Sequence, residues 1–144
     1  MPGKETQVAF RVRYCETDQM GTFSSARALD WFELGRTEHL RRLGQPYAEM
    51  EHKGVFLPVV EAHVQYLGRA RYDDELQMHV SCQMVGKVRV RFDIHIARAD
   101  ESASVASGYT VHAIVDASGK PARPPGWFVA AIDGLDTVTP DQTD

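Results

Sequence analysis

Apolar and polar residues alternate along several stretches of this chain, with the period of two expected of half-buried strands. Between Gln7 and Tyr14 the apolar residues occupy every second position and arginines lie between them. After a break at Gly54, the segments that predict further strands are Val55 to Leu67, Leu76 to Met84, Val88 to Ile96 and Val105 to Val115. The predicted sheet therefore has one apolar face and one polar face.

A helical period follows the first strand, because apolar residues recur there every three or four positions. The hydroxyls of Ser24 and Ser25 can cap its first turn, and Gly44 is a residue type that commonly ends a helix. A helix of about five turns is predicted, with a shorter one from Pro46 to Met50. The buried stripe of the long helix is expected to contain Ala28, Leu29, Phe32, Gly35, Arg36, Leu40 and Leu43.

The alternation also predicts how neighbouring strands pair, since directly opposed residues of antiparallel strands share a face. The expected opposed pairs are Met84 with Val88, Ile96 with Val105, and Phe92 with Tyr109. One long helix and a sheet with a single apolar face favour an α+β fold, in which an antiparallel sheet curls around the helix. The polar face is left for water or another subunit.

The length of 144 residues, 43% of them hydrophobic, suits one globular domain. We expect that domain to span residues 1–132. Prolines and glycines become frequent after Gly119, and residues 133–144 are polar. This end is predicted to be a disordered tail.

The composition argues against several classes of protein. A net charge of −4 does not suggest a nucleic-acid-binding surface. Cys15 and Cys82 lack the spacing of a zinc site or a disulfide framework, which favours reduced thiols and a cytoplasmic protein. No apolar run is long enough to cross a membrane, and no signal peptide is expected. The histidines are scattered, so no metal site is expected; three of them, His79, His95 and His112, fall on the predicted polar face.

An acidic turn, Glu16-Thr-Asp18-Gln-Met-Gly21, lies between the first strand and the long helix. A carboxylate just ahead of a helix can act as a base or nucleophile, while free N–H groups at the helix start stabilise a negatively charged carbonyl oxygen. Glu16 is expected to stay solvated or to pair with Arg13. Asp18 and Gly21 also suit an ordinary turn, which is the structural alternative to catalysis.

Three segments, in order, resemble motifs of one enzyme family: Arg13 to Arg36, Val64-Gln-Tyr66-Leu-Gly-Arg-Ala-Arg-Tyr72-Asp-Asp-Glu-Leu76, and Gly119-Lys-Pro-Ala-Arg-Pro-Pro125. Together they resemble the hot-dog-fold acyl-CoA thioesterases of the 4-hydroxybenzoyl-CoA thioesterase family. The resemblance spans most of the chain and implies a hot-dog fold, an antiparallel sheet wrapped around one long central helix. It also favours catalysis over the plain turn at Asp18.

In that family the acid of a D-x-x-G turn attacks the thioester carbonyl or activates water, and this acid corresponds to Asp18. A backbone N–H at the start of the central helix holds the carbonyl oxygen; seven residues after the acid, it corresponds to Ser25. Family members commonly carry Tyr-His and Asn-Tyr where this chain has Ser24-Ser25 and Arg27-Ala28. The smaller side chains should leave more room for an acyl group.

Coenzyme A carries phosphates that require arginine or lysine donors. Arg69, Arg71 and Arg89 are the basic residues predicted to bind it, and Gly21 and Ser24 complete the expected substrate-binding set. Glu33 and Arg36 match the family's E-x-x-R, whose spacing permits an ion pair on the helix. No bound cofactor is expected, because coenzyme A enters as part of the substrate.

The predicted function is therefore hydrolysis of an acyl-CoA to a carboxylic acid and free coenzyme A. The resemblance implies a homodimer with a continuous sheet, or a homotetramer. One alternative is a thioesterase acting on acyl carrier protein, which would need a basic docking surface. Another is a hot-dog protein that binds acyl thioesters, or assembles with partners, without catalysis. A dehydratase of the same fold is less favoured, since His39 lies too far along the helix to form its acid–histidine pair.

Overall fold

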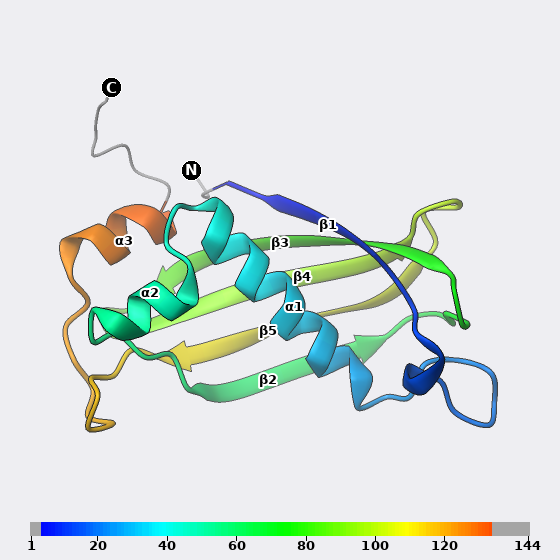
Figure 1. Ribbon diagram of the computed structural model, residues 1–144, viewed down its shortest axis with the longest axis horizontal. Coiled ribbons are helices and arrows are strands. Elements are labelled where there is room, and N and C mark those ends of the chain that lie inside the picture. Colours follow the sequence, from blue (N-terminus) through cyan, green and yellow to red (C-terminus); the bar gives the residue numbers. More distant parts are fainter. Residues whose placement is uncertain (1–3, 134–144) are drawn as a thin grey trace.

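The computed structural model describes residues 4–133 and contains one antiparallel sheet with the strand order β1-β3-β4-β5-β2. Its strands are β1 (Thr6–Arg11), β2 (Val59–Tyr66), β3 (Glu75–Val85), β4 (Arg89–Arg98) and β5 (Ser104–Ala113). The helices are a short 3₁₀ turn, η1 (Tyr14–Glu16), then α1 (Arg27–Arg42), α2 (Tyr47–His52) and α3 (Gly126–Asp133). Figure 1 shows α1 lying across one face of the sheet, which confirms the predicted α+β hot-dog arrangement.

The long helix approaches the sheet closely at Gly35. A Cβ atom at this position would lie 2.7 Å from Met78 Sδ and 2.9 Å from Val80 Cγ2, both on β3. Ala28, Phe32 and Leu40 of α1 are buried as predicted, whereas Leu29 is 43% exposed. The other side chains that α1 buries are Trp31 and His39, which the predicted stripe did not include.

The β3–β4 hairpin has the predicted faces but a different register. Met84 pairs with Val90 instead of Val88. Gly86, whose φ of +66° suits a glycine, opens the turn, so the loop is 86–88 and the pairing moves by two residues. A shift of two residues keeps every side chain on its face.

The β4–β5 pairing contains an irregularity that reverses one predicted face. Ala97 pairs with Ser104, but the register shifts between Ile96 and Ala97. Beyond the shift Ile96 pairs with Ala106 and Phe92 pairs with Thr110, so both predicted pairs, Ile96–Val105 and Phe92–Tyr109, are wrong. A one-residue shift turns a strand over. Tyr109 therefore lies on the outer face, with the Arg91 guanidinium 3.9 Å from its ring centroid.

The same shift moves one of the three histidines predicted on the polar face. His112 is buried, because the β5 residues beyond the irregularity have exchanged sides. His79 and His95 are opposed residues of β3 and β4, as expected for the outer face. The prediction is thus confirmed for His79 and His95 and wrong for His112.

Two predictions are wrong in the segment between the first strand and α1. Tyr14, predicted to face inward, is 77% exposed because β1 ends at Arg11 and Tyr14 begins η1. Neither Ser24 nor Ser25 caps α1; Ala26 is the N-cap residue, without a side-chain hydrogen bond. The serine carbonyls instead accept the N–H groups of Arg27 and Ala28, in the turn that precedes the helix.

The edge strand β2 is exposed along most of its length. It lies at the opposite edge of the sheet from β1 (Figure 1). Apolar side chains on it and just beyond it remain about half exposed: Val59, Val60, Tyr66 and Leu67. An unpaired edge with apolar side chains is a surface that commonly pairs with another strand.

The predicted tail, residues 133–144, falls outside the described residues except for Asp133, which ends α3. None of the helices found in residues 4–133 is long and apolar enough to span a membrane.

Candidate active site

The acidic turn forms a narrow hairpin between η1 and α1, at the right of Figure 1. Its base is a bridge between Thr17 and Phe23. Within it, the Asp18 N–H donates to the carbonyl oxygen of Thr22 (2.9 Å), and the Gly21 N–H donates to that of Asp18 (3.0 Å). Gly21 has a φ of +80°, a conformation that glycine adopts without strain. These bonds give Asp18 a defined backbone position at the surface.

The Asp18 carboxylate is exposed and only partly engaged. Its Oδ1 atom accepts a 2.9 Å hydrogen bond from the Met20 N–H. Its Oδ2 atom has no hydrogen-bond partner within residues 4–133. The turn thus orients the side chain through one oxygen and leaves the other able to act on a substrate.

Ser25 lies two residues before the first residue of α1. No acceptor within residues 4–133 receives its N–H, whereas its carbonyl oxygen accepts hydrogen bonds from the Tyr66 hydroxyl (2.7 Å) and the Ala28 N–H (3.3 Å). Among these residues the N–H of Ser25 is thus free, and it lies just ahead of the positive end of the α1 dipole. The Ser25 N–H can therefore serve as a donor to a negatively charged oxygen.

Tyr66 has a contact with the site that the sequence did not predict. It is the last residue of β2, and its ring lies 6.1 Å from that of Phe23, centroid to centroid. Tyr66 lies within the second motif, Val64 to Leu76, and this was the only feature of the sequence that could have pointed to a role at the site. A strand that ends beside the start of α1 thereby fixes the carbonyl of Ser25.

Arg69 lies directly beside the acidic turn. Its Nη2 atom donates a 3.0 Å hydrogen bond to the Met20 carbonyl oxygen. The neighbouring Ala70 exchanges hydrogen bonds with the same turn, accepting from the Phe23 N–H (2.9 Å) and donating to the Thr22 hydroxyl (3.1 Å). Segment 69–70 therefore supports the turn from outside and places one guanidinium against the turn that carries Asp18.

The other predicted coenzyme A ligands are less closely grouped. Arg71 is exposed, and its N–H donates to Asp74 Oδ2 at 2.8 Å. Arg89 begins β4 opposite Val85, at the end of the sheet away from the acidic turn. A strand of ten residues spans about 30 Å. One chain thus groups Gly21, Ser24, Ser25 and Arg69 in or beside the segment from the acidic turn to the start of α1, but Arg89 lies elsewhere. The roles of all these residues stay predictions.

The second carboxylate of the turn, Glu16, is buried, so the expectation that it stays solvated is wrong, while its pairing with Arg13 is confirmed. Burial acts to raise the pKa of this carboxyl group. Hydrogen bonds from the backbone and side chain of Arg13 and from Trp31 outweigh burial and hold the pKa below its usual value. Glu16 is therefore ionised but fully engaged, which leaves Asp18 as the available carboxylate.

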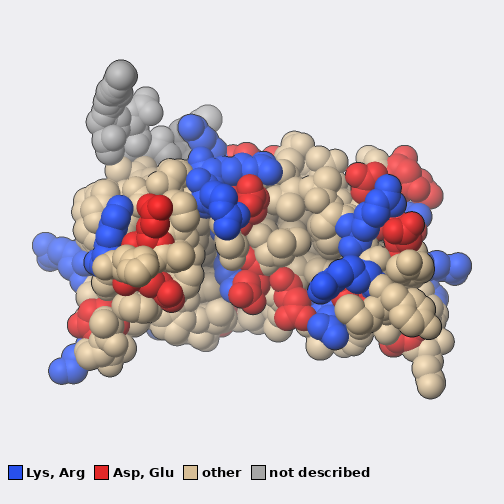
Figure 2. All heavy atoms as spheres, in the orientation of Figure 1, with Lys and Arg blue, Asp and Glu red and all other residues tan. Residues whose placement is uncertain are grey.

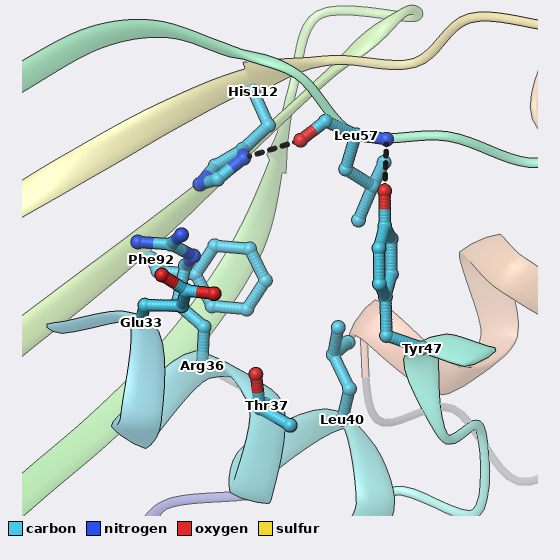
Figure 3. A pocket seen from close by; sticks show the side chains of 8 residues that line it. All are labelled: Glu33, Arg36, Thr37, Leu40, Tyr47, Leu57, Phe92 and His112. Carbon is cyan, nitrogen blue, oxygen red and sulfur yellow. Dashed lines mark hydrogen bonds between the residues drawn. The ribbon is translucent and has the colours of Figure 1, made fainter. Parts of the chain in front are cut away.

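A separate cavity of about 90 Å³ lies further along α1 (Figure 3), lined by Glu33, Arg36, Thr37, Leu40, Tyr47, Leu57, Phe92 and His112. His112 Nδ1 donates to the Leu57 carbonyl, and the Tyr47 hydroxyl oxygen accepts from the Leu57 N–H. Burial lowers the pKa of His112 to about 4 and also lowers that of Arg36. Glu33 and Arg36 line the same cavity, but no ion pair within 4.0 Å joins them among the described residues. The permitted E-x-x-R pair is thus absent.

Charges of both signs are interspersed over the face shown in Figure 2. This face carries no extended basic field of the kind that binds nucleic acid. No group of three or more His, Cys, Asp or Glu side chains in residues 4–133 is arranged to hold a metal ion.

Comparisons with known proteins bear on the family and the fold of this chain. Residues 12–132 match the sequence model of the thioesterase-like superfamily. A Bacillus subtilis protein named as a candidate acyl-CoA thioesterase, YneP, is 38% identical over 85 residues, which cover 59% of this chain and 62% of that protein. The match thus spans less than two thirds of that relative's length.

Solved structures have the same fold. A hypothetical protein from Thermus thermophilus is 29% identical with a TM-score of 0.84, over 92% of this chain and 98% of that one. A 1,4-dihydroxy-2-naphthoyl-CoA thioesterase from Synechocystis is 19% identical with a TM-score of 0.83, over 90% and 96% of the two chains. At that identity the second likeness concerns the fold alone.

Proposed function

This chain belongs to the thioesterase-like superfamily, and we propose that it hydrolyses the thioester bond of an acyl-coenzyme A, releasing a carboxylic acid and free coenzyme A. The observation that carries the proposal is the exposed Asp18 carboxylate, held by a closed turn with one oxygen free, just before α1. The Bacillus subtilis relative named as a candidate acyl-CoA thioesterase supports the choice of substrate class.

In the proposed reaction, Asp18 either attacks the thioester carbonyl or removes a proton from the attacking water. The carbonyl oxygen becomes negatively charged, and the N–H of Ser25 stabilises it; one such donor is worth about 3 kcal/mol in comparable sites. The bond between carbon and sulfur then breaks, and the thiolate of coenzyme A leaves and takes up a proton. Where water attacks, the acid is released directly; where Asp18 attacks, water then hydrolyses the anhydride between the acyl group and Asp18, which releases the acid and restores the carboxylate. Water and these groups of the chain suffice for this chemistry.

The phosphates of coenzyme A are proposed to bind near the acidic turn. Arg69 supports this placement, since its guanidinium contacts the turn itself, and Arg71 lies two positions further along the same segment. Gly21 presents no side chain there, and the half-buried Ser24 leads into the helix start. Arg89 would take part only if a second copy of the chain brought it to this end.

A homodimer is proposed through the free edge of β2, whose apolar side chains are about half exposed. A tetramer would use a further surface, such as the polar outer face. Light scattering of the purified chain distinguishes monomer, dimer and tetramer.

A panel of acyl-coenzyme A esters tests the function, with release of the free thiol measured for short, long and aromatic acyl groups. The same acyl groups on acyl carrier protein form the second arm. Hydrolysis of the coenzyme A esters supports the proposal, and hydrolysis of the carrier-protein esters alone would support the first alternative. Binding of both without any thiol release would identify an acyl-thioester-binding protein.

A further inference from the structure

We infer that Glu16 is a positioning residue for the proposed hydrolysis: its buried carboxylate fixes the Asp18 turn relative to α1. This inference rests on the proposed function and extends it to a residue other than the attacking group. Only 4% of Glu16 is exposed. A group so buried cannot itself attack a thioester that binds at the surface beside Asp18.

Both oxygens of the Glu16 carboxylate are engaged. Oε1 accepts a 2.7 Å hydrogen bond from the backbone N–H of Arg13. Oε2 accepts from the Arg13 side chain, through Nη2 at 3.1 Å and Nε at 3.2 Å, and from Trp31 Nε1 at 3.1 Å. Hydrogen bonds to an ionised carboxylate are stronger than neutral ones, so this set holds the side chain firmly.

The Trp31 bond ties the carboxylate to the helix. Trp31 lies in the second turn of α1 and is buried, with its ring centroid 5.2 Å from that of Phe10 and 4.8 Å from that of Phe23. Packing against these two rings therefore fixes the orientation of the indole and the direction of its N–H. The carboxylate that receives this N–H is fixed to α1 in turn.

The backbone of Glu16 connects to the other side of the acidic turn. Its carbonyl oxygen accepts a 2.8 Å hydrogen bond from the N–H of Ser24, the residue before Ser25. Glu16 itself lies two residues before Asp18. A hydrogen bond joins it to Ser24, in the chain after Asp18, and another joins it to Trp31 of α1. These attachments fix the acidic turn, which carries Asp18, relative to the helix start, which follows Ser25.

A glutamine at position 16 would keep the shape of the side chain but not its bonds. It offers one acceptor oxygen, while its NH₂ group would face donors from Arg13 or Trp31 that it cannot receive. Buried donors left without an acceptor are costly, so the turn should shift or loosen. Small displacements of catalytic groups reduce turnover by as much as about 100-fold.

The test compares Glu16→Gln, Trp31→Phe and the double variant with the native chain. Trp31→Phe keeps an aromatic ring in the core and removes the indole donor with part of the indole, so it keeps the inference testable if Glu16→Gln fails to fold. Gly35→Ala is the control, because it disturbs the contact of α1 with β3 and not the turn. We expect kcat to fall on the order of 10- to 100-fold in both single variants, with KM nearly unchanged. In the double variant the losses should not add, because both remove the same link.

Amide hydrogen exchange at Ser24 and Gly21, measured by NMR, is the second readout, and it does not depend on turnover. Faster exchange in Glu16→Gln and Trp31→Phe but not in Gly35→Ala supports positioning. Unchanged kcat and unchanged amide exchange in folded Glu16→Gln would overturn the inference. A fall of kcat in Gly35→Ala as large as that in Glu16→Gln and Trp31→Phe would also overturn it. If the native chain hydrolyses no thioester, the proposed function fails, and the exchange rates alone decide whether Glu16 fixes the turn.

Discussion

The Tyr66 hydroxyl donates a 2.7 Å hydrogen bond to the carbonyl oxygen of Ser25, 41 residues earlier in the sequence. Tyr66 ends the exposed edge strand, and Ser25 carries the proposed oxyanion donor. The strand β2, whose edge is free to pair with a second copy of the chain, therefore also fixes the backbone at Ser25. Pairing of β2 should stabilise the arrangement at the helix start.

Tyr66→Phe tests this connection. The variant loses one hydrogen bond worth about 1 kcal/mol, so we expect turnover to fall by up to about fivefold and the melting temperature to fall by about 2–4 °C. Thiol release from acyl-coenzyme A measures the first and calorimetry the second. Tyr72→Phe is the matched control, since Tyr72 is exposed and its hydroxyl makes no hydrogen bond within residues 4–133. Equal turnover in the two variants would contradict the role given to Tyr66.

Asp18→Asn should abolish most of the activity. Asparagine keeps an oxygen that can accept the Met20 N–H, so the turn should persist, but the amide is neither a base nor a nucleophile. We expect turnover to fall at least about 100-fold with the melting temperature preserved. Asp30→Asn serves as control because Asp30 is an exposed carboxylate of α1 that pairs with Arg27. Retained activity in Asp18→Asn would assign the chemistry to another group.

Arg69→Met should weaken substrate binding more than turnover. Removing a guanidinium near the coenzyme A phosphates should raise KM several-fold at low salt, with a smaller effect at high salt because exposed charges are screened. Arg41→Met, at the far end of α1, removes an exposed arginine paired with Glu38 and should leave KM unchanged. A KM for Arg69→Met that matches the native value at every salt concentration would refute the assignment.

Gly35→Ala should destabilise the fold through packing alone. The added methyl group would meet Met78 and Val80, and overpacking of this kind costs about 1–3 kcal/mol of the free energy of unfolding. Gly126→Ala is the comparison: a Cβ there meets nothing within 4 Å, and the residue begins α3. Urea unfolding of both variants measures the difference. A native-like midpoint for Gly35→Ala would mean that β3 moves aside without cost.

Buried histidines should make the fold sensitive to acid. Burial, with a smaller effect of Arg42, lowers the pKa of His39 from 6.5 to about 4. Because the folded value lies below the unfolded one, the unfolded chain takes up the proton first as the pH falls. The contribution of the neutral His39 to the free energy of unfolding should therefore be complete above about pH 6.5. It should be lost progressively between that pH and pH 4, by roughly 3 kcal/mol for such a shift.

The measurement is the free energy of unfolding between pH 7 and 4 for the native chain and His39→Gln. We expect a shallower decline in the variant, whereas His79→Gln, on the outer face, should follow the native curve. Parallel curves for all three proteins would show that His39 does not titrate as its burial implies.

The fold was largely predictable from the sequence because each element carries a local signal. The strand period, the helical stripe and Gly44, whose φ is +87°, depend only on neighbouring residues. The pairing of β4 with β5 was not predictable in this way. Its register depends on an irregularity between Ile96 and Ala97, and no residue type there requires one. His112 was placed on the wrong face for that reason alone.

The candidate site, too, was predictable only in part from the sequence. The sequence separated Asp18 from Glu16 only through a family resemblance, whereas the structure separates them by burial and hydrogen bonding. The contacts of Tyr66 with Ser25 and of Arg69 with Met20 join residues more than 40 positions apart. Side-chain contacts across such separations have no local pattern in a single sequence.

The irregularity between β4 and β5 also bears on how this chain should be aligned with its relatives. Ser104 and Ala106 pair with the adjacent residues Ala97 and Ile96, so Val105 is the additional residue, inside β5 and not in the turn before it. Loss of one residue here would exchange the inner and outer rows of β5, bringing Tyr109 into the core and His112 to the surface. A gap of one residue at this point in an alignment would therefore mark a relative with a different interior, not merely a shorter loop.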